Sequence, residues 1–93
     1  MEALSNAIFE LLKSTKPARR EFGPLIVAMR PGRFMVYRAD RYPTSDEISL
    51  VVRAAGPAGL PLHGNPKYYE STSGRSDVVW HVAAWDLETI PLN

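Results

Sequence analysis

Two histidines, His63 and His81, carry the side chains in this chain that are best suited to act as a general base or as metal ligands. If residues 77–85 form a strand, Asp77 and His81 share a face. At about 3.3 Å per residue they then stand roughly 13 Å apart, too far for a direct pair. Neither H-x-x-H nor H-E-x-x-H spacing is present. We therefore interpret His81 as a structural histidine and predict no metal site.

The candidate hydroxyl nucleophiles lie in one short stretch around a predicted turn, Ser71, Thr72, Ser73 and Ser76. A catalytic serine needs a base and an oxyanion hole, whereas Ser-Thr-Ser-Gly without a G-x-S-x-G motif is typical of a plain turn. The chain contains no cysteine, which excludes disulfides, thiolate zinc sites and cysteine nucleophiles. We expect no enzymatic activity and no cofactor.

Side chains suited to binding are concentrated between positions 30 and 42. The candidate binding residues are Arg30, Arg33, Arg38, Arg41, Tyr37 and Tyr42. Arginine and tyrosine are common anchors in protein interfaces, so we expect a protein partner. In the alternative, the arginines contact phosphates and the aromatic residues stack on bases of a nucleic acid. A sequence pI of 8.1 lies below the value of about 9 that is typical of nucleic-acid-binding domains.

A β-hairpin is predicted to carry these residues. Its strands are the apolar runs Leu25–Met29 and Phe34–Tyr37, and Pro31-Gly32 between them is typical of a type II turn. Side chains alternate along a strand, so Arg33 and Arg38 fall on opposite faces. We expect the arginines at the tip, Arg30 and Arg33, to be the exposed ones.

Two helices are predicted to flank this hairpin. Leu4, Ile8, Leu11 and Leu12 recur at helical spacing within residues 3–16, and Lys16 and Pro17 mark the end of that helix. In the second helix, Thr44 and Glu47 form a capping box before residues 46–55, and Gly56-Pro57 is a stop signal. Alternation of Ile48, Leu50 and Val52 also fits a strand, but the caps favour a helix.

The remaining segments are a connector, a loop and a second hairpin. We interpret residues 18–22 as a basic connector and Gly56–Pro66, rich in glycine and proline, as an irregular loop. Lys67–Thr72 and Asp77–Trp85 read as two strands joined by a turn at 73–76, with a tail over 86–93 that docks loosely. Both faces of the second strand carry a tryptophan, which predicts a central strand that is covered on both sides or lies at an interface.

These elements predict an α+β fold in a single domain spanning residues 1–93. The order is α-β-β-α-β-β, and runs of hairpins with interspersed helices favour an antiparallel sheet with two helices packed on one face. Pairing of strand edges between two copies would give a homodimer.

Charge is distributed unevenly along the chain. Residues 1–41 hold eight Lys/Arg against four Asp/Glu, and residues 42–93 hold three against six. The acidic second half is therefore expected to neutralise some of the arginines. No apolar run approaches the roughly 20 residues of a membrane span, and no basic segment precedes the first apolar stretch, so we expect no membrane association and a cytoplasmic location.

In character the chain is similar to the small, cysteine-free α+β inhibitors with which phages and mobile elements block host defence systems, the anti-CRISPR type. The likeness is one of type and rests on no shared motif. It implies a non-catalytic protein that acts by stoichiometric protein–protein interaction, through steric or electrostatic occlusion of its target.

Overall fold

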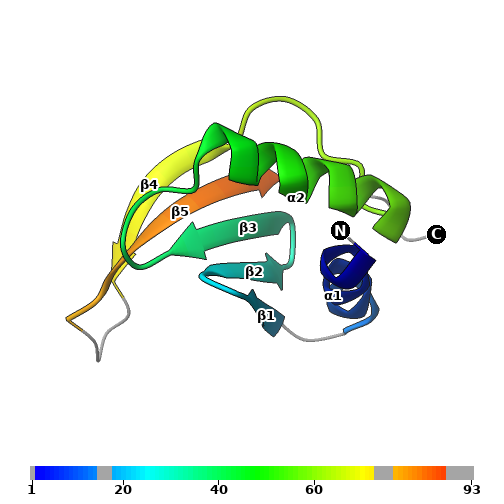
Figure 1. Cartoon of the computed structure of the whole chain (residues 1–93), viewed down its shortest axis with the longest axis horizontal. Helices are drawn as coiled ribbons and strands as arrows, with labels where there is room; N and C mark the ends of the chain where they lie inside the picture. Colours follow the sequence, from blue (N-terminus) through cyan, green and yellow to red (C-terminus); the bar gives the residue numbers. More distant parts are fainter. Residues whose placement is uncertain (1, 15–17, 73–76, 88–93) are drawn as a thin grey trace.

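The chain folds into two α-helices and one five-stranded antiparallel sheet, as a computed structural model describes for residues 2–14, 18–72 and 77–87 (Figure 1). The elements in order are α1 (Glu2–Lys13), β1 (Ala18–Phe22), β2 (Leu25–Arg30), β3 (Arg33–Arg38), α2 (Ser45–Ala58), β4 (Lys67–Thr72) and β5 (Val79–Asp86). The predicted α+β class is confirmed, with one strand more than the predicted order contained.

The sheet order is β1-β2-β3-β5-β4, and every neighbouring pair is antiparallel. Strands β1 to β3 form a meander, and the second hairpin adds to it through β5, which lies between β3 and β4. The predicted turn at Pro31-Gly32 joins β2 to β3, where Arg30 pairs with Arg33 and Gly32 has a φ of 77°. The prediction of a central second strand in the last hairpin is confirmed.

The extra strand β1 corrects the interpretation of residues 18–22 as a connector. Ala18 pairs with Met29 and Phe22 with Leu25, so β1 is an edge strand of the sheet. Charged residues protect an edge strand from pairing with other chains, which accounts for the basic character that suggested a connector. The turn before β2 is Gly23-Pro24, with Gly23 at a φ of 62°.

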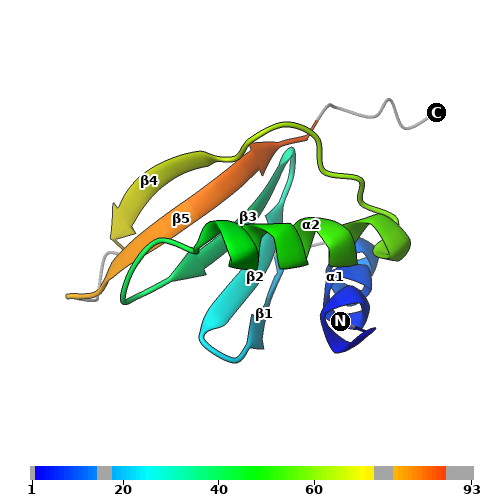
Figure 2. The same cartoon turned by 45° about the horizontal axis from the view of Figure 1, so that its top comes forward.

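The main core lies between the sheet and the two helices, both of which cover the same face (Figure 2). Figure 2 shows α2 crossing in front of the sheet, with α1 beside its C-terminal end. The largest fully buried side chains are Phe34, Leu4, Ile8, Leu11, Val27, Val36 and Val51. Phe34 packs against Trp85 with ring centroids 5.9 Å apart, which joins the two hairpins inside the core.

Helix α2 begins where the sequence predicts and ends later. Thr44 and Glu47 form the capping box, with the Glu47 amide donating to Thr44 Oγ1 at 3.2 Å. The stop predicted at Gly56 is wrong, because the helix runs to Ala58. Proline in the last turn costs only one helical hydrogen bond, and Gly59, at a φ of 100°, ends the helix in a left-handed cap.

The other boundaries shift by a few residues. α1 ends at Lys13, and the predicted signals Lys16 and Pro17 lie outside the described residues, as do the turn at 73–76 and most of the tail. β5 begins at Val79 rather than Asp77. Among the described residues, no helix is both long and apolar enough to cross a membrane.

Candidate functional site

The sheet has a second face, opposite the helices, which carries its own side-chain cluster. Strand register places Arg19, Ala28, Met35, Ala84 and Lys67 in one row across the five strands, and Glu21, Ile26, Tyr37, Val82 and Tyr69 in the next. Arg30, Arg33 and Asp86 lie at one end of these rows, and Trp80 and Ser71 lie at the other. We call this surface the open face, because both helices lie on the other side.

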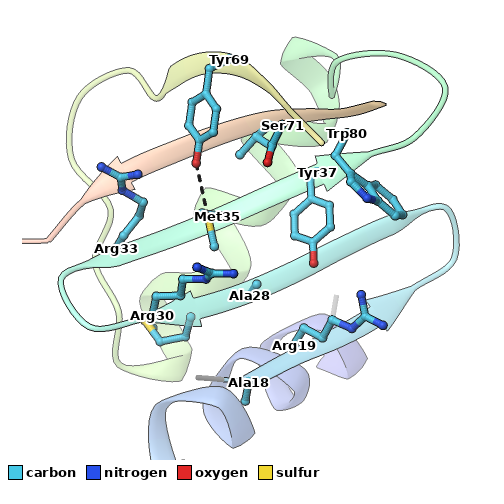
Figure 3. A pocket seen from close by; sticks show the side chains of 12 residues that line it. Ala18, Arg19, Ala28, Arg30, Arg33, Met35, Tyr37, Tyr69, Ser71 and Trp80 are labelled. Carbon is cyan, nitrogen blue, oxygen red and sulfur yellow. Dashed lines mark hydrogen bonds between the residues drawn. The ribbon is translucent and has the colours of Figure 1, made fainter. Parts of the chain in front are cut away.

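A groove of about 740 Å³ runs over the open face (Figure 3). Its lining comes from all five strands and comprises Ala18, Arg19, Ala28, Met29, Arg30, Arg33, Met35, Tyr37, Tyr69, Ser71, Trp80 and Val82. Two nearly buried side chains form the floor: Ala28 is only 5% exposed and Val82 only 3% exposed. Because longer side chains stand around them, the groove is concave.

Aromatic rings form the wall of the groove. Tyr37 and Trp80 meet edge to face with ring centroids 5.2 Å apart, and Figure 3 shows both pointing into the groove. The Tyr69 hydroxyl donates to the sulfur of Met35 at 3.5 Å. All three rings are half-buried and pack against a small cluster of Ala28, Met35, Val82 and Ala84. The open face therefore keeps apolar and aromatic surface that the fold itself does not cover.

Positive charge lines the groove, and part of it is already neutralised. Asp86 accepts from Arg33 Nε at 3.2 Å and from Lys67 Nζ at 3.1 Å. Lys67 and Arg33 hold the pKa of the Asp86 carboxyl below its usual value. The Tyr69 hydroxyl and Asp86 raise the pKa of the Arg33 guanidinium, which keeps it charged. Asp86 thus ties β3, β5 and β4 together at one end of the groove.

Arg19 and Arg30 have no acidic partner among the described residues. Arg19 pairs in register with Ala28, and Arg30 lies two residues further along β2 on the same face. Such diagonal neighbours stand roughly 7–8 Å apart. Figure 3 shows the two side chains on either side of Ala28. Two unpaired guanidinium groups therefore flank the floor of the groove.

The predicted binding residues separate into two groups. Arg30, Arg33 and Tyr37 line the groove, whereas Arg38 lies on the helix-covered face, only 8% exposed. The Arg38 guanidinium donates to both oxygens of Asp40 at 2.8 and 2.7 Å and to Glu47 Oε2 at 2.7 Å.

Arg41 belongs to the same ion-pair network as Arg38. Its Nη1 donates to Glu47 Oε1 at 2.8 Å, and the Thr44 amide donates to that oxygen at 2.8 Å. Hydrogen bonds from the arginines lower the pKa of Asp40 and of Glu47 to about 2. This network holds the start of α2 against β3, so Arg38 and Arg41 make structural contacts.

Tyr42 lies in that second group and packs between two rings. Its ring meets Tyr68 at 5.7 Å and His81 at 4.9 Å, edge to face in both cases. His81 Nδ1 is buried without a hydrogen-bond partner, and His63 is exposed in the loop before β4. Among the described residues, no three His, Cys, Asp or Glu side chains lie close enough to hold a metal ion.

Sequence reasoning missed several residues of the groove, above all Arg19, Tyr69 and Trp80. Arg19 was overlooked with β1, although Gly23-Pro24 is a turn signal between two short runs and could have indicated a strand over residues 18–22. Tyr69 and Trp80 were assigned to strands, but nothing in their spacing says that they meet Tyr37. That meeting depends on the pairing of β3 with β5.

Comparison of the chain with protein-family models, with curated proteins and with solved structures finds no match.

Proposed function

We propose that this chain is a non-catalytic binding protein that acts by stoichiometric interaction with another protein through the open face. The observation that carries the proposal is the groove itself: half-buried aromatic rings, left uncovered by the helices, beside two arginines without acidic partners.

The residue types of the groove support a protein partner. Tyrosine, tryptophan, methionine and arginine are enriched at the energetically important positions of protein interfaces. The groove contains all four types in Tyr37, Trp80, Met35 and Arg30. Burying the exposed parts of these side chains would contribute roughly 25 cal/mol per Å² of apolar surface.

The action that follows from such binding is occlusion. A protein without chemistry of its own changes a target by covering a surface that the target needs, as inhibitors of the phage and mobile-element type do. The two free guanidinium groups would add electrostatic steering toward an acidic surface.

Capture experiments with a matched pair of variants test the proposal. Ser71 and Thr72 are exposed neighbours on β4; Ser71 lines the groove, and alternation turns Thr72 to the other face. We expect the immobilised wild-type chain and Thr72→Trp to capture the same protein from a lysate of the native host. Ser71→Trp should lose it, because the new indole fills the groove. Capture that Ser71→Trp leaves intact would refute the open face as the site.

The same experiment distinguishes the nucleic-acid alternative. Capture that nuclease abolishes would indicate a nucleic acid partner held through phosphate contacts. For a protein partner, nuclease has no effect on capture.

A double charge reversal, Arg30→Glu with Arg33→Glu, provides a second test at the end of the groove. We expect it to abolish capture while the melting temperature falls by no more than about 4–8 °C, because Arg33 and Asp86 form an exposed ion pair and such pairs contribute about 1 kcal/mol or less. Circular dichroism melting measures this directly. Loss of folding would instead assign these arginines a structural role.

A further inference from the structure

We infer that the segment held in the groove is an extended, acidic stretch of polypeptide, with a carboxylate between Arg19 and Arg30 and an apolar side chain against Tyr37 and Trp80. This inference rests on the proposed function and specifies the chemistry of the partner.

Charge complementarity supports the acidic character of the segment. Arg19 and Arg30 stand roughly 7–8 Å apart as diagonal neighbours, and each lacks a carboxylate partner among the described residues. Both guanidinium groups are positively charged and mobile on long side chains, and one carboxylate placed between the two positions can accept charge-assisted hydrogen bonds from both. Glu21 shares the face with Arg19 but forms no ion pair with it.

The apolar part of the groove adjoins this charged pair. Tyr37 lies on β3 one row from Ala28, and its ring meets Trp80 edge to face. An aromatic or branched aliphatic side chain can complete this arrangement, since aromatic pairs favour tilted contacts with centroids about 4.5–7 Å apart. An extended segment with an acidic and an apolar side chain two positions apart presents both to the same side and so matches the two halves of the groove.

The size of the open face favours an extended segment over a folded domain. Five strands spaced about 4.8 Å apart and about 20 Å long present on the order of 400–500 Å². A stable interface between folded proteins needs about 800 Å² on each partner. A groove of about 740 Å³ can instead hold a short linear stretch.

The pairing of the other cations weighs against a nucleic acid strand. Within residues 18–72 and 77–87, four cationic residues lie on the open face, and Asp86 already pairs with two of them, Arg33 and Lys67. The phosphates of a nucleic acid would have to displace the Asp86 carboxylate or come close to its negative charge. A single carboxylate bound by Arg19 and Arg30 avoids this repulsion.

Three labelled probes test the inference by fluorescence anisotropy. The first is an eight-residue peptide that carries aspartate and phenylalanine in turn at every second position, with serine between them, so that both types point to the same side when the peptide is extended. The second has asparagine in place of each aspartate, and the third is an eight-nucleotide oligouridylate. We expect the acidic peptide to bind at least about tenfold more tightly than the asparagine peptide, the change that follows from losing one charge-assisted hydrogen bond.

Neighbouring arginines on β1 provide a matched control. Arg19→Ser and Arg30→Ser should each weaken binding of the acidic peptide by about tenfold. Arg20→Ser should leave binding unchanged, because Arg20 is equally exposed but points to the opposite face. If Arg19→Ser and Arg20→Ser lowered the affinity for the acidic peptide equally, the inference would be overturned. The peptide would then respond only to the overall positive charge of the protein.

The two tryptophans report where a probe binds. Trp80 lines the groove, whereas the Trp85 indole is buried and donates to the Gly64 carbonyl at 3.3 Å. In ¹⁵N-resolved NMR spectra, the acidic peptide should shift the Trp80 indole resonance and leave that of Trp85 in place. A probe that shifts neither resonance binds elsewhere and contradicts the inference.

Failure of this inference is distinguishable from failure of the proposed function. Equal binding of both peptides at Trp80 would overturn the acidic segment but leave the open face as a protein-binding surface. A second outcome leads to the same conclusion: neither peptide binds, yet the wild-type chain captures a partner that Ser71→Trp does not capture. This outcome would also overturn the acidic segment and leave the open face as a protein-binding surface. Tighter binding of the oligouridylate than of either peptide would refute both proposals.

Discussion

The substitution Glu47→Gln tests whether the ion-pair network at the start of α2 holds the helix to the sheet. Glutamine has nearly the shape of glutamate and can still accept from the Thr44 amide. It loses the negative charge that faces Arg38 at 2.7 Å and Arg41 at 2.8 Å. Arg38, with a side chain only 10% exposed, then keeps Asp40 as its one carboxylate partner.

The expected cost follows from the contacts that are lost. Hydrogen bonds to charged groups contribute about 1.5–3 kcal/mol each, but Arg41 is 45% exposed and its ion pair is screened by solvent. The pair with Arg38 therefore dominates, and Asp40 limits the penalty of leaving that charge buried. We expect a loss of about 2 kcal/mol, equivalent to roughly 8–16 °C in melting temperature for a domain of this size.

The stability difference between wild type and Glu47→Gln should depend on pH, and the direction of this dependence can be checked. The pKa of Glu47 is about 2 in the folded chain against an ordinary value of 4.5. A lowered folded-state pKa stabilises the fold above the unfolded-state pKa, and this stabilisation is lost as pH falls from about 4.5 toward 2. The difference in melting temperature between wild type and Glu47→Gln should therefore shrink over that range.

Asp46→Asn is the matched control for this measurement. Asp46 is the exposed carboxylate next to Glu47 in the first turn of α2, and it forms no ion pair among the described residues. Thermal unfolding followed by circular dichroism at pH 7 and at pH 2.5 compares the variants. Two results would contradict the role of the network. One is a fall in melting temperature for Asp46→Asn as large as that for Glu47→Gln, and the other is a fall for Glu47→Gln at pH 2.5 as large as at pH 7.

Two further pairs of substitutions test the fold by urea unfolding. Gly56→Ala should stabilise the chain by about 0.5–1 kcal/mol, because Gly56 lies inside α2 and an added methyl group meets nothing within 4 Å. Gly59→Ala should destabilise it by about 1–2 kcal/mol, because Gly59 has a φ of 100°. Phe34→Ala should cost about 3–5 kcal/mol, since Phe34 is fully buried. Phe9→Ala should cost about 1 kcal/mol or less, since Phe9 is 48% exposed. Reversed signs for the glycines, or similar losses for the two phenylalanines, would contradict these assignments.

Features with local causes were predictable from the sequence. The Pro31-Gly32 turn and the Thr44–Glu47 capping box each depend on residues within four positions of one another, and both are present. Alternation along β5 also placed Trp85 and Trp80 on opposite faces, as their separate clusters confirm.

Features that depend on distant pairing were not predictable. β1 is short and mostly charged, and it becomes a strand because β2 offers it an edge to pair with. Arg30 and Arg38 are the same residue type in the same hairpin, yet one lines the groove and the other is buried beside α2. Strand alternation places them on opposite faces, but it does not say which face α2 covers, and the burial of Arg38 depends on the position of the α2 N-terminus.

The insertion of β5 between β3 and β4 has a consequence for the order of folding. Arg33 and Asp86, which pair across β3 and β5, are separated by 53 positions. Closing a loop of that length costs roughly 3–4 kcal/mol of chain entropy, whereas the turns within each hairpin close over a few residues. We therefore expect the meander and the second hairpin to form early as separate units, and their association to limit the folding rate. Because the groove draws on both units, the binding surface is completed only in that last step.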